Sequence, residues 1–155
     1  MSTSLVNLSS LEPGNLSLEV FNAVARVTVT PVIELIITDG QSVLLRSRPD
    51  TDQYWPGQYC LPGSIVYSGG PRSLEEYLGK ILTSIGVSTA FVKFGLVGVE
   101  VYSTKRGDEV TIIYKVYTNI RANISGNLKV VRIKNTMVID LIPEHKDILR
   151  KYLIG

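Results

Sequence analysis

The segment from Ser73 to Gly86 constrains the fold most, because it carries clear helix signals at both ends. Ser73 followed by Glu76 forms a capping box, which predicts that a helix begins there. Gly86 is typical of the left-handed residue that ends a helix. The apolar residues between these ends recur at helical spacing: Leu74, Leu78, Ile81, Leu82 and Ile85. Such a helix has one apolar face, which must be buried against another layer. Gly79 is its weak point, at about 1 kcal/mol relative to alanine.

Strand-like segments surround this helix. Asp39-Gly40 predicts a hairpin turn, Arg106-Gly107-Asp108 predicts a second turn, and Pro143 introduces a final helix. The predicted strands are Leu18 to Thr30, Val32 to Thr38, Ser42 to Arg48, Gln58 to Leu61, 90–104, 109–121 and 128–134, and the final helix is Glu144 to Leu153. This order predicts an α/β (α+β) sandwich, in which helices cover a mixed, largely antiparallel sheet.

The 155 residues fit one domain. Residues 1–17, rich in Ser, Asn and Leu, are predicted to be a flexible N-terminal tail, and residues 18–155 a single domain. The 16 basic and 14 acidic residues leave a net charge of +2. This balance is too even to indicate a nucleic-acid or anionic-membrane partner.

Cys60 and His145 are the single cysteine and the single histidine. They exclude a disulfide within the chain and a zinc site of Cys/His type. We expect Cys60 to be a small buried hydrophobe and His145 to lie in the solvated first turn of the final helix.

No run of about 18 apolar residues occurs, so no membrane span is expected. The N-terminus lacks the basic start and long apolar core of a secretory signal. A cytoplasmic protein without a membrane partner is therefore predicted.

Several local patterns together resemble the Nudix hydrolase family. They are the hairpin ending in Leu44-Leu45-Arg46-Ser47-Arg48, the loop with Trp55-Pro56-Gly57, Leu61-Pro62-Gly63, the helix closing at Gly86, and the final segment from Leu141 to Leu149. The resemblance covers about residues 18–153. It implies a Nudix-like α/β/α sandwich, but the family's defining signature, the Nudix box, is degenerate.

In the family, a loop and helix place several glutamates on one face, where they hold Mg²⁺ or Mn²⁺ beside a diphosphate. Counting back from Gly86, the Glu-Glu pair of the box is replaced by Thr83 and Ser84, and its Arg-Glu by Gly79 and Lys80. The isolated glutamate falls on Pro71, or on Gly70 with a shifted insertion, and the first glycine on Ser64. Moving the register by one restores no carboxylate between Lys80 and Gly86. The sequence therefore predicts no resident metal and no catalytic residues.

Other carboxylates could supply oxygen ligands only in an altered arrangement. Glu75 and Glu76 are first-turn residues that favour the helix dipole. Glu100 is the most interesting of the residues outside the helix, since related hydrolases often take a carboxylate from outside the box. Glu34, Asp108 and Glu109 are further oxygen donors. Mg²⁺ or Mn²⁺ is expected only if such a set forms a hydrolase site.

A small set of residues could instead bind a ligand. Arg46 and Arg48 could clamp a phosphate or carboxylate, or be ordinary outward residues of a strand. Tyr54 and Trp55 could stack on a base or plug the sheet end. Lys80 could meet a phosphate in place of the metal, or be a solvated helix lysine.

Three functions follow from these patterns. The first is a catalytically inactive Nudix-fold protein that binds a nucleotide-like phosphate ligand or a protein partner in the former active-site cleft. The second is a metal-dependent hydrolase of nucleoside diphosphate-linked compounds that uses Glu75, Glu76 and Glu100. The third is a structural or homodimerisation domain with part of its interface in strands 90–121.

Overall fold

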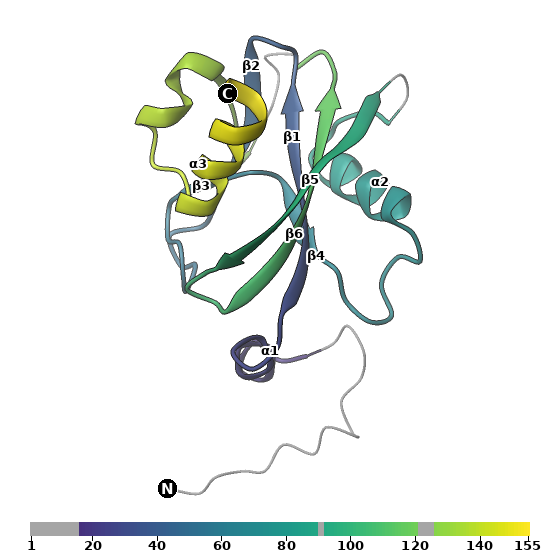
Figure 1. The fold of residues 1–155 in the computed structure, drawn as a ribbon, viewed down its shortest axis with the longest axis vertical. Helices are drawn as coiled ribbons and strands as arrows, with labels where there is room; N and C mark the ends of the chain where they lie inside the picture. The colour runs from purple at the N-terminus through teal and green to yellow at the C-terminus, as the bar shows by residue number, and fades with distance from the viewer. Residues whose placement is uncertain (1–15, 90–91, 121–125) are drawn as a thin grey trace, which may run out of the picture.

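The computed structural model describes residues 16–89, 92–120 and 126–155. These residues form a seven-stranded sheet with helices against both of its faces (Figure 1). In chain order the elements are α1 Leu18–Ala25, β1 Thr30–Thr38, β2 Ser42–Ser47, β3 Tyr59–Cys60, β4 Gly63–Ile65, α2 Leu74–Ser84, β5 Lys93–Ser103, β6 Asp108–Tyr117, β7 Leu128–Arg132, the 3-10 helix η2 Ile133–Val138, α3 Pro143–Leu149 and the π-helical turn η3 Arg150–Ile154. The predicted α/β/α sandwich is confirmed.

The sheet is mixed and largely antiparallel, as predicted. Only β1 and β6 run parallel, while the other strand pairs are antiparallel. β1 and β2 pair at Thr38 and Val43 and then separate. In the opening between them, β4 pairs with β1 opposite Val32–Glu34, and β3 pairs with β2 opposite Arg46 and Ser47. The two halves of the sheet therefore diverge toward the start of β1.

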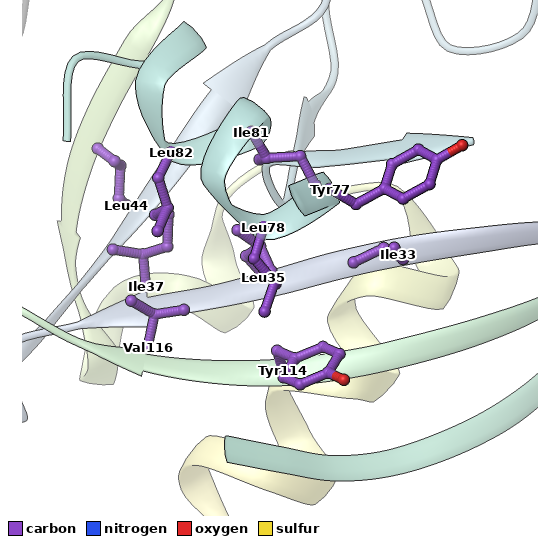
Figure 2. Packing of buried hydrophobic residues seen from close by; sticks show 10 residues of the cluster. All are labelled: Ile33, Leu35, Ile37, Leu44, Tyr77, Leu78, Ile81, Leu82, Tyr114 and Val116. Atoms are coloured by element: carbon purple, nitrogen blue, oxygen red, sulfur yellow. The ribbon is translucent and has the colours of Figure 1, made fainter. Parts of the chain in front are cut away.

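β1 is buried on both faces, because its side chains alternate between the two helical layers. Its odd-numbered residues meet α2: Ile33, Leu35 and Ile37 pack against Tyr77, Leu78, Ile81 and Leu82, together with Tyr114 and Val116 of β6 (Figure 2). On the other face, Ile36 packs with Ile148 and Leu149 of α3. This explains the continuous apolar run of β1, which is typical of a central strand covered on both faces.

The ends of α2 are built as the sequence predicts. The Ser73 hydroxyl accepts a hydrogen bond from the Glu76 N–H at 3.2 Å. At the other end Gly86 has a φ of 72°, and the N–H groups of Gly86 and Val87 donate to the carbonyls of Thr83 and Leu82. These two bonds form a Schellman motif, which satisfies carbonyls that the helix would otherwise leave unpaired.

The predicted strand from Leu18 to Thr30 is wrong over most of its length, because Leu18–Ala25 is helical. The apolar residues of this segment that suggested a strand also include a pair at helical spacing. Phe21 and Ala25, four residues apart, face the turn between β5 and β6, and Ser17 caps the helix by accepting from the Val20 N–H. The predicted tail lies outside the described residues except for 16 and 17.

The remaining differences lie at element ends. β4 falls where only a Pro-Gly turn was expected, the strand expected over 128–134 ends at Arg132, and the final helix changes to a π-helical turn after Leu149. None of the helices in the described ranges is long and apolar enough to cross a membrane.

Two glycines of the α2 segment give a matched test of this description. A Cβ at either Gly79 or Gly86 would meet no atom within 4 Å, but only Gly86 has a positive φ. Gly79→Ala should raise the free energy of unfolding by about 1 kcal/mol, because alanine is the better helix former. Gly86→Ala should lower it by about 1–2 kcal/mol, because a side chain disfavours the left-handed conformation. Urea denaturation measures both changes, and equal effects of the two substitutions would contradict the assigned helix end.

Candidate functional site

A cavity of about 320 Å³ lies on the α3 face of the sheet, where its two halves diverge. Its walls come from β1, β2, β3, β4, β5, β6, α3 and the loop 49–57. This volume is within the range of small-molecule sites, roughly 300–1,000 Å³. The charged or titratable side chains that line it include Glu34, Arg46, Arg48, Asp52, Arg106, Glu109, Glu144 and His145.

Strand register explains why two carboxyl groups share this wall. In parallel pairing, β1 residues Thr30, Val32 and Glu34 lie beside Glu109, Thr111 and Ile113 of β6. All six side chains therefore point to one face, the face that α3 covers, because partners in register share a face. Glu34 and Glu109 are both buried, each 8% exposed.

Two of the three arginines that line the cavity are already paired. Arg48 bonds Asp52 through Nε at 2.7 Å, and Arg106 bonds Glu109 through Nε at 2.9 Å. Burial disfavours the charged forms of both Arg48 and Asp52, but the hydrogen bond to Asp52 raises the pKa of Arg48. Backbone hydrogen bonds from Trp55 and Tyr54, together with Arg48, lower the pKa of Asp52 against the effect of burial. Arg46 makes no ion pair with any residue the structure describes.

Asp52 also orders the loop that closes one side of the cavity. Its Oδ1 accepts hydrogen bonds from the backbone N–H groups of Tyr54 and Trp55 at 3.0 and 2.9 Å. Trp55 is buried against Cys60 and Ile142. The guanidinium groups of Arg48 and Arg106 lie over its ring, 5.3 and 5.6 Å from the centroid. This geometry favours the interpretation of Trp55 as a plug over that of a stacking platform for a base. Tyr54 packs beside it and does not line the cavity.

His145 is a largely enclosed part of the cavity wall, with its side chain 13% exposed, so the expectation of a solvated residue is wrong. Pro143 starts α3 only two residues earlier, and the first turn faces the sheet. The Leu61 N–H donates to Nδ1 of His145 at 2.7 Å, which requires an unprotonated Nδ1 and leaves the proton on Nε2. Burial lowers the pKa of His145 to about 3, and the charges of Arg48 and Arg106 act in the same direction. The imidazole is therefore neutral near pH 7.

Glu34 is the most perturbed carboxyl group of the site. Burial raises its pKa well above the ordinary value, the charge of Glu109 raises it further, and Arg106 and Arg48 oppose this only in part. Its Oε1 faces Nε2 of His145 at 3.5 Å. Because the imidazole is neutral, we describe this contact as a weak polar approach and not as an ion pair.

Several buried polar atoms of the cavity wall have no hydrogen-bond partner among the residues that the structure describes. They are Oε2 of Glu34, Nε1 of Trp55 and Oε2 of Glu144. Buried polar groups are normally hydrogen-bonded, and an unpaired one costs about 1–3 kcal/mol. The cavity is therefore chemically equipped to receive a molecule that offers both donors and acceptors.

The residues assigned from the sequence to the box positions lie away from this cavity. Gly79, Lys80, Thr83 and Ser84 are on α2, which packs on the opposite face of the sheet, and none of them lines the cavity. Lys80 is exposed. The Ser84 hydroxyl donates to the carbonyl of Ile81 at 2.7 Å. Ser64 lies on β4, and Gly70 and Pro71 precede α2.

The residues present do not fit a divalent metal of the Nudix type. Glu75 and Glu76 are exposed on α2, where Glu76 accepts from the Arg72 N–H at 3.0 Å. Glu100 is on β5 and accepts hydrogen bonds from Lys151 and Tyr152, so it faces η3. Among the described residues no group of three or more His, Cys, Asp or Glu side chains could hold a metal ion.

Sequence reasoning found part of this site. Arg46, Arg48 and Trp55 do line one cavity, and Cys60 is buried as predicted. Burial raises the pKa of the Cys60 thiol to about 11, so it stays protonated. Arg106 and the wall position of His145 were missed. Glu34 had been considered only as an oxygen ligand, although a glutamate inside the apolar run of β1 is itself a signal of a special environment.

Several solved structures are similar to this chain in their fold. NrtR of Shewanella oneidensis has a TM-score of 0.62 and 19% sequence identity over 79% of this chain, and this chain spans 61% of the length of NrtR. The NUDIX domain of the same protein, complexed with ADP ribose, has a TM-score of 0.64 and 18% identity over 88% of this chain and 96% of the domain. A mutT/nudix family protein from Listeria innocua has a TM-score of 0.61 and 17% identity over 80% and 92% of the two chains.

This chain has the Nudix fold. The likeness in structure exceeds the likeness in sequence, since no protein-family model and no curated protein matches the sequence. The expectation that nucleic acid is not a partner finds no support among these Nudix-fold neighbours, because NrtR has also been solved with a 27mer DNA.

His145 provides a test of the cavity wall. Its pKa falls from an ordinary 6.5 to about 3 on folding, so below pH 6.5 the unfolded chain binds a proton that the folded chain does not. The free energy of unfolding should therefore decrease as the pH is lowered from 6.5 to 3. His145→Asn keeps an acceptor for the Leu61 N–H and does not titrate. Its urea-denaturation profile should be flatter than that of the wild type in this window, whereas parallel profiles would contradict an enclosed, neutral His145.

Proposed function

We propose that this chain is a Nudix-fold binding domain without metal-dependent hydrolase activity, which binds a nucleotide-like phosphate ligand in the cavity between the sheet and α3. The observation that carries the proposal is the chemistry of the cavity wall. It combines unpaired buried polar atoms of Glu34, Trp55 and Glu144 with one arginine, Arg46, that has no ion pair. Binding sites typically join an enclosed cavity to a few polar groups of this kind.

Arg46 is the proposed phosphate contact. It is exposed, and it lines both the cavity and an adjoining open groove that runs past Tyr59, Asn127 and Lys129. A ligand with an uncharged part in the cavity and its phosphates at Arg46 would match this distribution of charge. Arginine suits that role because its guanidinium binds phosphate oxygens through two parallel hydrogen bonds. Lys80, Glu100, Tyr54 and the degenerate box do not line the cavity, so they have no direct part in this binding mode.

The degenerate box supports the absence of hydrolysis. The box positions hold Gly79, Lys80, Thr83 and Ser84, which provide no carboxylate oxygen, and a lysine opposes a nearby cation. The alternative carboxylates Glu76 and Glu100 are engaged with Arg72 and with Lys151 and Tyr152. Neither fact favours the hydrolase alternative.

The test uses ADP-ribose and nucleoside diphosphates as probes. Isothermal titration calorimetry in the presence of EDTA should detect binding, and product analysis with Mg²⁺ or Mn²⁺ should detect no turnover. Hydrolysis that is abolished by Glu76→Gln or Glu100→Gln would overturn the proposal in favour of the second function. Absence of binding to every probe would overturn the nucleotide-like ligand.

Arg46 and Lys80 provide a matched pair of variants. Arg46→Gln should weaken probe binding by about 1.5–3 kcal/mol, the contribution of a hydrogen bond to a charged group. Lys80→Gln removes an equal charge outside the cavity and should leave affinity unchanged. Calorimetric titration of both variants measures the difference, and a larger loss in Lys80→Gln would place the phosphate at α2 instead.

Homodimerisation is the second candidate function, favoured by the apolar surface of β5. This strand ends the sheet order, and Phe94, Leu96, Val99 and Val101 are 49–71% exposed. Exposed apolar residues on an edge strand favour association with another strand. Sedimentation of the wild type and of Val101→Lys tests this candidate: a dimer that the substitution converts to a monomer would support it, and a monomeric wild type would contradict it.

A further inference from the structure

Glu34 is a buried carboxyl group that makes no ion pair with an arginine or lysine among the described residues. Arg46 lines the same cavity but is exposed, and the cations whose charges act on Glu34 are Arg106 and Arg48. The nearest cations are committed elsewhere: Arg48 to Asp52 and Arg106 to Glu109. Glu109 itself brings a second carboxylate to the same face. A buried, unpaired carboxylate would be strongly destabilising, and such groups are normally neutralised by binding a proton.

The neighbouring histidine determines which oxygen carries that proton. Because Nδ1 of His145 accepts from the Leu61 N–H, its Nε2 bears hydrogen, and this atom lies 3.5 Å from Oε1 of Glu34. Oε1 is therefore the acceptor atom of the carboxyl group. The hydroxyl is then at Oε2, the buried atom that has no partner in the cavity wall.

We propose that Glu34 is a specificity-determining residue, which acts as an uncharged carboxylic acid and donates a hydrogen bond from Oε2 to an acceptor atom of the ligand. The inference rests on the proposed function, because it uses the same cavity. Its ligand class is an uncharged heterocycle with a ring nitrogen or carbonyl acceptor, as nucleobases have. An ionised carboxylate would select the opposite chemistry, a donor or a cation.

All the charged or titratable groups around Glu34 agree with this assignment. Arg48 of the loop after β2 and Arg106 of the β5–β6 turn are cations that are already paired, and Glu109 of β6 is the partner of Arg106. Asp52 of the loop is the partner of Arg48. Glu144 and His145 of α3, Cys60 of β3, Tyr102 of β5 and the exposed Arg46 of β2 also line the cavity. The imidazole, the thiol and the phenol are neutral. Raising the pH until Glu34 ionises should therefore remove the donor and place two carboxylates on one wall.

The first test measures the protonation of Glu34 without any ligand. Infrared difference spectra of the full chain at pH 7, wild type minus Glu34→Gln, should contain the C=O stretching band of a protonated carboxylic acid. Glu100→Gln is the matched control, because this glutamate is paired with Lys151 outside the cavity, and its difference spectrum should contain no such band. Absence of the band at Glu34 would overturn the inference and leave the proposed function standing.

The second test compares the binding of AMP, GMP, CMP, UMP and ribose 5-phosphate by calorimetry. At least one nucleotide should bind more tightly than ribose 5-phosphate, which has no base. Glu34→Gln keeps a neutral donor and should bind that nucleotide within about threefold of the wild type. Glu34→Leu should bind about tenfold more weakly, equivalent to about 1.4 kcal/mol for one lost hydrogen bond.

The pH dependence separates the remaining outcomes. Nucleotide binding by the wild type should weaken as the pH rises, whereas Glu34→Gln should show no such loss. Equal affinity in the wild type and Glu34→Leu, with both proteins folded by circular dichroism, would overturn the role of Glu34 alone. Tight binding of ribose 5-phosphate, with no gain from a base, would overturn the heterocycle while supporting a phosphate ligand. Failure of all five compounds, and of ADP-ribose and the nucleoside diphosphates, to bind would overturn the proposed function itself.

Discussion

β1 runs through the centre of the molecule and is covered on both faces, and the rest of the structure depends on this double burial. Its odd-numbered side chains form one core with α2, and Ile36 belongs to the other core with α3. Apolar burial contributes about 25 cal/mol per Å², so a strand that is buried on both faces contributes to stability through both of its faces. Glu34 is the one ionisable residue of β1, and it lies where a cavity interrupts the core on the α3 face.

The cavity exists because β1 and β2 pair at only one position before they diverge. β3 and β4 fill the opening as short strands, each paired with a different neighbour. Backbone hydrogen bonds of the sheet are thereby preserved while the side chains spread apart, which leaves room beneath α3. Two ion pairs, Arg48 with Asp52 and Arg106 with Glu109, form part of the cavity wall. Both guanidinium groups lie over the ring of Trp55. Among the described residues of the wall, Arg46 is then the arginine without an ion pair, and Oε2 of Glu34 is a buried atom without a hydrogen-bond partner.

α2, which carries four of the positions assigned to the Nudix box from the sequence, and the cavity lie on opposite faces of one sheet. α2 has kept its cap, its apolar face and its Schellman end, so it stabilises the fold even though its box positions provide no carboxylate. A scaffold helix and a ligand-binding wall can therefore change independently, since the first depends on apolar contacts and the second on a few polar atoms. This separation is consistent with the general observation that function resides in sites rather than in folds.

The sequence by itself determined the elements that depend on local chemistry. Ser73 and Gly86 delimit α2, Asp39-Gly40 turns the first hairpin, and the continuous apolar run of β1 indicates a strand buried on both faces. The helix Leu18–Ala25 was mistaken for a strand because a short apolar pattern satisfies both periods. Only the tertiary structure brought Glu34, Arg106 and His145 together, since these residues are far apart in sequence and meet through parallel pairing of β1 with β6 and through the docking of α3. The protonation of Glu34 likewise depends on which arginines are already paired, and no local pattern contains that information.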